Sequence, residues 1–544
     1  MKGCGMAVLI GQKLVNSLTL LILAGLLLIM PEAAQAQSGT CGVVDAIDYP
    51  IPTENLVRGY DDFGLFRKNF GGNHTGVDLD FDHWGDPVKA AARGLVTYSD
   101  PLGWDTEKGV VILSHDFPDG SRTYSLYGHV EETDTIKLPP VGTCIERGQV
   151  IAAVGWPSRG RPHLHLEFRS ILPREGGPGY VSNNPLDDGW FNPLDFIATW
   201  RAKFSPAFLK AISFDNVASL PPTQMDNGAY LTASGSIISV VMPPDQPLWQ
   251  IQTDSPIDGI TALTGDRVVA HSNSGQTVTL NGGRYGAVWN IASANTPFVT
   301  LGERLIFLMQ DGSVNAYDAA GTLIWTLPDR GQVVYFGGNG SEVAVATREA
   351  DDIVWQTLNA EGQGPNAVQL KNNPLVYVEA DGRWLVLDGQ ALTRINAGQN
   401  EPITTLPKVA GRAAQLTSDT VGNIYVYMDD SNHTLMAIGS DGQTRWSIQY
   451  PRELKGDPPL LASGNGCLLY TLDVDGTLNV FSATDGRLVN QIGLYAGGRR
   501  TTNPHGRLLK VDAAEQLYVA SGFLSLLVFD GTKLGGESKD CLAG

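Results

Sequence analysis

The sequence predicts a mainly β protein with at least two domains. Its 544 residues exceed the roughly 250–300 residues at which a single hydrophobic core stops growing. Glycine is abundant, with 63 residues, and charged residues make up only 17% of the chain. This mix is typical of many short strands joined by turns rather than of long helices. Strand-like runs alternate with Asp-Gly and Gly turns from about residue 228 to the end. We therefore expect an N-terminal β-sheet domain followed by a C-terminal array of repeated β units.

The charge balance is strongly acidic. Lys and Arg total 38, and Asp and Glu total 57, so the formal net charge is −19. Contacts to phosphate groups need clustered cations. The composition therefore argues against a nucleic acid partner, and it suits a soluble protein outside the cytosol.

The first 36 residues have the pattern of a cleaved signal peptide. Residues 17–30 form an uncharged apolar stretch, and Ala34-Gln35-Ala36 has the small-residue spacing of a cleavage site. We expect cleavage after Ala36 and no membrane span thereafter. The alternative is an uncleaved anchor helix, but the stretch falls short of the ~20 residues needed to span a bilayer.

Export changes how the cysteines are interpreted. Without the signal peptide four remain, Cys41, Cys144, Cys467 and Cys541, an even number in an oxidising compartment. Pairing within domains gives Cys41–Cys144 and Cys467–Cys541, which is the expected arrangement. Four buried free thiols are the alternative.

Histidines are concentrated in the N-terminal half. Six of the nine lie between residues 74 and 165, as is typical of a metal or acid–base site. His74 and Asp78 stand four residues apart in HTGVDLDF, which reads as a turn entering a strand because Gly and β-branched residues disfavour helix. A turn can still bring an imidazole and a carboxylate to one ion, and Zn²⁺ accepts both donors.

The segment HLHLEFR, residues 163–169, alternates as a strand does. Its leucines and phenylalanine fall on one face, and His163, His165 and Glu167 fall on the other. One imidazole can then bind metal while its neighbour moves protons, and Glu167 can orient a ligand through a hydrogen bond. His129 lies in another alternating stretch, YSLYGHVEE. His83 and His115 are weaker candidates for a direct role in metal binding or catalysis.

These motifs resemble the lysostaphin-type (LytM-like) zinc metalloendopeptidases, which cut peptide bonds in the cross-links and stems of bacterial peptidoglycan. The resemblance runs from about residue 55 to 200 and rests on HTGVD, GDPVKAAARGLV, YGHV, VGTCIERGQVIAAVG and HLHLEF. It implies a β-sheet domain of barrel-sandwich type with one Zn²⁺ bound by His74, Asp78 and His165. It also implies that His129 and His163 assist catalysis, without assigning which of them is the general base.

One stretch departs from the family pattern. The residues before HLH are usually rich in Gly, Ser and Thr, whereas residues 156–162 here read WPSRGRP. The departure removes no metal ligand, but it affects the expected substrate groove and hence the cleavage specificity.

The C-terminal three hundred residues repeat. DGSVNAYDAAGTLIW (311–325) and DGTLNVFSATDGRLVN (475–490) both read as turn, strand, small turn and strand. Units recur every 30–45 residues, roughly the period of four-stranded propeller blades. The strings resemble quinoprotein-like (pyrroloquinoline-quinone-type) propeller repeats and imply seven or eight blades; a solenoid or two β-sandwiches is the alternative. The recurrent tryptophans, Trp249, Trp289, Trp325, Trp355 and Trp446, are expected to pack blades together.

Taken together, the patterns predict an exported peptidoglycan endopeptidase, secreted or held in the cell envelope, whose propeller docks it to the wall or to an envelope protein. Two alternatives remain: a zinc peptidase acting on secreted proteins, and a non-catalytic envelope scaffold working through the propeller. The expected divisions are a signal peptide (1–36), an N-terminal segment (37–54), a zinc metallopeptidase domain (55–204), a linker (205–227) and a β-propeller (228–544).

Overall fold

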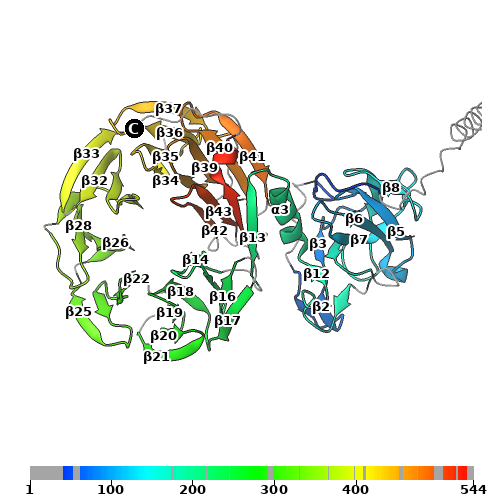
Figure 1. Cartoon of the computed structure of the whole chain (residues 1–544), viewed down its shortest axis with the longest axis horizontal. Coiled ribbons are helices and arrows are strands. Elements are labelled where there is room, and N and C mark those ends of the chain that lie inside the picture. The colour runs from blue at the N-terminus through cyan, green and yellow to red at the C-terminus, as the bar shows by residue number, and fades with distance from the viewer. Residues whose placement is uncertain are drawn as a thin grey trace, which may run out of the picture.

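The computed structural model describes residues 41–52, 62–172, 177, 179–214, 219–243, 246–291, 298–329, 331–365, 367–396, 398–407, 412–451, 458–474, 476–494, 507–521 and 525–535. The expected signal peptide lies outside these ranges. A β-sheet domain and a ring of small sheets meet at helix α3, Pro193–Lys203 (Figure 1). Among the described residues, no helix combines the length and the apolar character needed to cross a bilayer. The predicted mainly β fold, with an N-terminal β domain and a propeller, is confirmed.

A nine-stranded sheet forms the N-terminal domain, with the path β12-β10-β7-β6-β5-β8; β3 pairs with β10, and β9 joins β4 to β7. Its strands are β3 (Val77–Leu79), β4 (Pro87–Lys89), β5 (Gly94–Asp100), β6 (Gly109–Asp116), β7 (Arg122–Glu131), β8 (Cys144–Ile145), β9 (Val150–Val154), β10 (Leu164–Arg169) and β12 (Trp190–Phe191). A 3₁₀ turn, η1 (Asp105–Glu107), precedes β6. A second sheet contains β1 (Phe66–Arg67), β2 (Gly72–His74) and β11 (Tyr180–Val181).

Strand β10 is buried on both faces. Leu164, Leu166 and Phe168 enter the main hydrophobic core, as the alternation predicted. His165 and Glu167, on the opposite face, are also buried. The sheet therefore holds polar groups in a region where each needs a partner.

Eight four-stranded antiparallel sheets form the ring in Figure 1. The first seven in chain order are β14 (Thr223–Gln224), β15 (Tyr230–Ser234), β16 (Ile237–Met242) and β17 (Gln246–Gln252); β18 (Ile257–Ala262), β19 (Arg267–Ser272), β20 (Gln276–Asn281) and β21 (Arg284–Asn290); β22 (Phe298–Leu301), β23 (Arg304–Leu308), β24 (Val314–Tyr317) and β25 (Leu323–Leu327); β26 (Gln332–Gly338), β27 (Val343–Glu349), β28 (Asp352–Leu358) and β29 (Val368–Leu370); β30 (Leu375–Val378), β31 (Trp384–Asp388), β32 (Ala391–Asn396) and β33 (Gln399–Thr405); β34 (Arg412–Ser418), β35 (Ile424–Asp429), β36 (Thr434–Ile438) and β37 (Thr444–Gln449); and β38 (Leu460–Ser463), β39 (Leu468–Leu472), β40 (Thr477–Ser482) and β41 (Leu488–Gly493).

The eighth sheet closes the ring with both ends of the propeller. It contains β42 (Arg507–Val511), β43 (Gln516–Ser521) and β44 (Ser525–Asp530), and β13 (Phe208–Ser213) pairs antiparallel with β44. A short helix, α4 (Gly531–Leu534), follows β44. The segment 205–227 was expected to be a linker, but β13 and β14 are built into two propeller sheets. β13 becomes a propeller strand because it hydrogen-bonds to β44, at the far end of the chain. The local sequence does not reveal this pairing.

Neighbouring sheets interlock through tryptophan and glycine. Trp249, on the outer strand β17, packs so closely against Gly283 in the last hairpin of the next sheet that a Cβ there would lie 2.8 Å from the tryptophan. The same contact recurs for Trp289 with Gly321, Trp325 with Gly362 and Trp446 with Gly486. These tryptophans therefore pack blades together. Trp355 also packs two blades together, but from the third strand, β28: it is buried, and its ring lies 5.5 Å from that of Trp384 in the next sheet.

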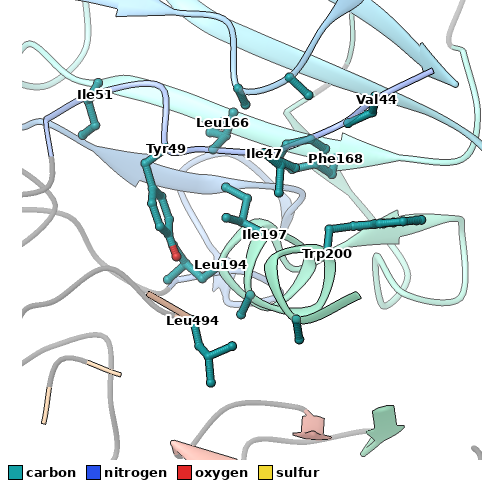
Figure 2. Packing of buried hydrophobic residues seen from close by; sticks show 14 of the residues in the cluster. Val44, Ile47, Tyr49, Ile51, Leu166, Phe168, Leu194, Ile197, Trp200 and Leu494 are labelled. Atoms are coloured by element: carbon teal, nitrogen blue, oxygen red, sulfur yellow. The ribbon is translucent and has the colours of Figure 1, made fainter. Parts of the chain in front are cut away.

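Helix α3 joins the two domains. Asn192 caps its start by accepting a hydrogen bond from the backbone N–H of Leu194 at 3.0 Å, and Pro193 takes the first turn, where no N–H is needed. Leu194, Ile197 and Trp200 share a core with β10 and with Leu494 of the propeller (Figure 2).

Arg201 strengthens this junction. Its Nη1 donates to the carbonyl of Gly493 at 2.8 Å, and its Nη2 lies 3.1 Å from Asp48 Oδ1. Within the N-terminal domain, Cys41 and Cys144 form a disulfide, as predicted. Cys467 is also disulfide-bonded, but Cys541, its expected partner, lies outside the described residues.

Candidate metal centre

Three predicted donors meet at one point. The antiparallel register of β3 and β10 places Asp78 opposite His165, and His74 ends β2 beside them. His74 Nε2 lies 2.9 Å from His165 Nδ1, and Asp78 Oδ1 lies 3.3 Å from each of these nitrogens. A tetrahedral zinc ion with bonds of ~2.0–2.1 Å separates its donors by roughly 3.3 Å. The donor atoms thus fit the size and chemistry of a zinc site.

Carboxylates hold the far side of both imidazoles. Asp62 Oδ2 lies 3.1 Å from His74 Nδ1, and Glu167 Oε1 lies 3.0 Å from His165 Nε2. A proton on each of these outer nitrogens leaves the inner nitrogen with its lone pair for a metal. Burial alone lowers the pKa of His74, but Asp78 and Asp62 outweigh it and raise that pKa to about 10. The local field therefore favours a cation at the point where the three donors meet.

Glu167 is fixed by several donors. Arg169 Nη1 donates to it at 2.9 Å, Trp190 Nε1 donates at 3.0 Å, and the Thr75 hydroxyl donates to its other oxygen. Burial alone raises its pKa, but the His165 hydrogen bond and charge and the Arg169 charge outweigh burial and lower the pKa to about 2. Glu167 is therefore an anion that orients the imidazole of His165.

We expect Glu167→Gln to weaken zinc binding about 10–100-fold, the usual effect of losing an outer hydrogen-bond partner of a ligand. The amide keeps the shape but loses the charge that supports a proton on His165 Nε2. Competition with a chromogenic chelator would measure the affinity. Glu146→Gln, on the exposed surface, is the control and should bind zinc as wild type does; equal affinity in both variants would refute the orienting role.

A β-bulge aims His129 at the site. Gly109 pairs with Val130 and Val110 pairs with Gly128, so His129 is the unpaired residue between them, with φ at +56°. Bulges of this kind redirect a side chain out of the sheet alternation. The positive φ is uncommon for a residue other than glycine, and it is held here by the pairing on either side.

His129 and His163 present matching nitrogens to the cleft. His129 Nδ1 lies 2.7 Å from the carbonyl oxygen of Glu107, and His163 Nδ1 lies 2.7 Å from that of Arg161. A carbonyl oxygen only accepts, so each Nδ1 carries a proton, and in the neutral imidazole Nε2 keeps a lone pair. Burial, followed by the charges of His163 and His165, lowers the pKa of His129 to about 3. His129 is therefore neutral at pH 7 and able to accept a proton.

All five predicted site residues lie together, and a cleft of about 710 Å³ opens onto Asp78, His129, His163 and His165. His163 Nε2 lies 3.6 Å from Asp78 Oδ1, and the His129 and His163 rings are 4.6 Å apart. Trp104 walls the cleft, with its ring 5.0 Å from that of His129 and 5.3 Å from that of His165. Sequence reasoning missed Trp104, Asp62 and Tyr180, because none of them stands near a motif.

The two weaker histidine candidates lie apart from this centre. His83 contacts Asp80 and Asp86, with Nδ1–oxygen distances of 3.2 and 3.0 Å. His115 is buried, with Nδ1 2.7 Å from the carbonyl of Arg93 and Nε2 2.7 Å from the hydroxyl of Ser125. Its two hydrogen bonds make His115 part of the structural core.

His115 should make stability depend on pH. Burial lowers its pKa from 6.5 to about 4. Between these values the unfolded chain binds a proton that the folded chain does not, so stability falls with acidification by up to about 1.4 kcal/mol per pH unit. Above pH 6.5 both states are neutral and this contribution is constant. Denaturant unfolding of wild type and His115→Gln should show a stability difference that narrows from pH 6.5 to pH 4.5. A constant difference would contradict the assignment.

A buried His–Asp–His donor set beneath two further imidazoles, at the floor of an open cleft, is typical of metal-dependent hydrolases. Residues 72–178 match the model of peptidase family M23, and residues 233–354 match the model described as outer membrane protein assembly factor BamB. Both predicted resemblances are confirmed. The chain is thus a peptidase-type domain joined to a propeller.

Two solved structures are similar to about three fifths of the chain. BamB from Moraxella catarrhalis is 16% identical with a TM-score of 0.42, covering 59% of this chain and 98% of its own. Sqt1 of Saccharomyces cerevisiae is 13% identical with a TM-score of 0.44, covering 60% and 99%. No curated protein matches the chain.

Proposed function

We propose that this chain is an exported zinc metalloendopeptidase that hydrolyses peptide bonds in peptidoglycan cross-links or stems. The observation that carries the proposal is the convergence of His74, Asp78 and His165 beneath the Nε2 atoms of His129 and His163. The match to peptidase family M23 supports the reaction class. The Cys41–Cys144 disulfide, together with the apolar N-terminal stretch, supports export.

Each site residue has a role in this reaction. His74, Asp78 and His165 would hold one zinc ion, which when bound polarises the scissile carbonyl and lowers the pKa of water toward ~7. One of His129 and His163 takes the proton from the attacking water. The other donates a proton to the leaving amine or hydrogen-bonds the developing oxyanion. A backbone carbonyl holds Nδ1 of each residue, which leaves each Nε2 facing the cleft.

The propeller would serve as a docking module. The BamB-like match covers residues 233–354, and we propose that the ring binds an envelope protein or the wall. Because α3 packs into both domains, a bound partner would set the direction in which the cleft faces.

The test is digestion of purified peptidoglycan by the chain from residue 37 onward, beside His165→Ala, with zinc measured on both samples. Wild type should release new amino termini and hold about one zinc per chain, and the variant should lose both. Cleavage of secreted proteins but not of peptidoglycan would mean that the substrates are secreted proteins. Absence of both zinc and cleavage would refute the proposal and leave a scaffold role.

A further inference from the structure

Two arginines project from the loop that departs from the family pattern. Arg159 and Arg161, separated by Gly160, line the same cleft as the metal donors. Their side chains are 63% and 54% exposed, respectively. The protein has a formal charge of −19. Two solvent-accessible arginines at one cleft of such an acidic protein therefore suggest a specific role.

Each guanidinium caps an aromatic stack that ends on a site histidine. Arg161 lies over the ring of Phe81 at 4.9 Å, and Phe81 stacks on His163 at 5.0 Å. Stacking of this kind holds a planar guanidinium in place while leaving its edge accessible. The stack therefore holds the guanidinium of Arg161 at the rim of the cleft, on the side of His163, with one edge accessible.

Arg159 repeats the arrangement on a second stack. It lies over Phe70 at 5.0 Å, Phe70 stacks on Tyr180 at 4.6 Å, and the Tyr180 ring lies 5.1 Å from His74. The two arginines therefore stand over different site histidines, each at the outer end of a rigid column.

The existing ion pairs leave a two-pronged edge on each arginine. Arg159 uses Nε toward Glu107 at 3.2 Å, and Glu107 also accepts from Ser158. Arg161 uses Nη1 toward Asp82 at 2.8 Å. Within the described part of the chain, these bonds leave the Nη1/Nη2 edge of Arg159 and the Nε/Nη2 edge of Arg161. Either edge can bind a carboxylate through two parallel hydrogen bonds.

Arg67, the third arginine at the cleft, is already engaged. It pairs with Asp62, whose side chain is 2% exposed and also faces His74. Partners of Arg159 and Arg161 are more open to solvent, at 15% for Glu107 and 49% for Asp82, and such pairs contribute little stability. Exchange of these partners for a substrate group is therefore feasible for Arg159 and Arg161 but not for Arg67.

We infer that Arg159 and Arg161 form a carboxylate-binding rim, and that the preferred substrate is an acidic peptide with a free carboxylate close to the scissile bond. This inference rests on the proposed peptidase function and narrows its substrate class. A neutral, glycine-only peptide would leave both edges unused. The arginines are specificity-determining residues that act on binding, whereas His129 and His163 act on the reacting atoms.

The experiment compares soluble cross-linked peptides from peptidoglycan with the same peptides after carbodiimide coupling to ammonia, which converts carboxylates to carboxamides. Wild type should cleave the acidic form with a kcat/KM about tenfold higher or more, mostly through KM, because hydrogen bonds to a charged group are lost in the amide. Arg159→Gln with Arg161→Gln should abolish this preference, so that the acidic and the amidated forms are cleaved with equal kcat/KM. Arg161→Lys alone keeps the charge but loses the two-pronged edge, and it should retain only part of the preference for the acidic form.

Binding separates this inference from the proposed function. His129→Ala, titrated calorimetrically with both peptide forms, should bind the acidic form about tenfold more tightly whether or not wild type cuts it. Tighter binding of the acidic form without any cleavage by wild type would refute the peptidase proposal but not the carboxylate-binding rim. Equal binding and equal cleavage of the two forms would overturn the carboxylate rim, as would a preference that persists in the double variant. Arg122→Gln, at an exposed pair with Asp116 outside the cleft, is the matched control and should behave as wild type.

Discussion

His129→Ala and His163→Ala are each expected to reduce kcat on peptidoglycan peptides by roughly 10²–10⁴-fold, the usual contribution of a positioned acid or base. Both imidazoles hold Nδ1 against a backbone carbonyl and direct Nε2 into the cleft. Neither belongs to the proposed ligand set, so zinc should remain near one per chain. Rate assays and metal analysis on the same samples would test this.

The control for this prediction is His433→Ala, which removes a propeller imidazole bonded to Tyr427 and should leave turnover unchanged. Full activity in both cleft variants would show that proton transfer does not use these residues. Loss of zinc in either variant would instead move that histidine into the ligand set.

Gly76→Ala is expected to lower zinc affinity at least about 100-fold and to inactivate the enzyme. A Cβ at this position would lie 2.3 Å from the carbonyl oxygen of Leu166 and 2.9 Å from the His165 ring. Backbone cannot yield at such contacts without moving β3 away from β10, and that pairing holds Asp78 opposite His165. Overpacking of this kind typically costs about 1–3 kcal/mol in stability as well. Metal titration together with thermal unfolding would measure both effects.

Gly120→Ala supplies the comparison, because a Cβ there meets nothing within 4 Å and the added strain comes only from its φ of +82°. It should lower stability modestly and leave zinc binding intact. Unchanged zinc affinity in Gly76→Ala would mean that the strands separate without disturbing the donors, and the close approach would lose its explanation.

The strands that carry the site could be predicted because their pattern is local. Alternation in residues 163–169 gave the two faces of β10, and the resemblance supplied the pairing of His74 and Asp78 with His165. The bulge at His129 could not be predicted, since it arises from the register between β6 and β7. Asp62 acts through a loop far from any motif, and its contact with His74 exists only once the sheets are packed.

In the propeller, too, only the features with a local sequence pattern could be predicted. Recurrent turns and tryptophans predicted the blades, whereas the close approach of Gly321 and Gly442 to the preceding blade is found only in the structure. Gly321 meets Trp289, whereas a Cβ at Gly442 would meet the carbonyl of Ile403 instead of a tryptophan. Closure by β13 was missed, because residues 208–213 carry no turn signal and their partner lies in β44.

Closure by β13 also has a consequence for biosynthesis. As the chain is synthesised at roughly 5–20 residues per second, the residues of the N-terminal sheet are made long before those of β44. Until then, β13 is an unpaired edge strand, and the α3 side chains that later pack on Leu494 and Phe529 are uncovered. Such surfaces invite pairing with other chains. Assembly of this protein should therefore depend on a holding chaperone during the interval in which the ring is open.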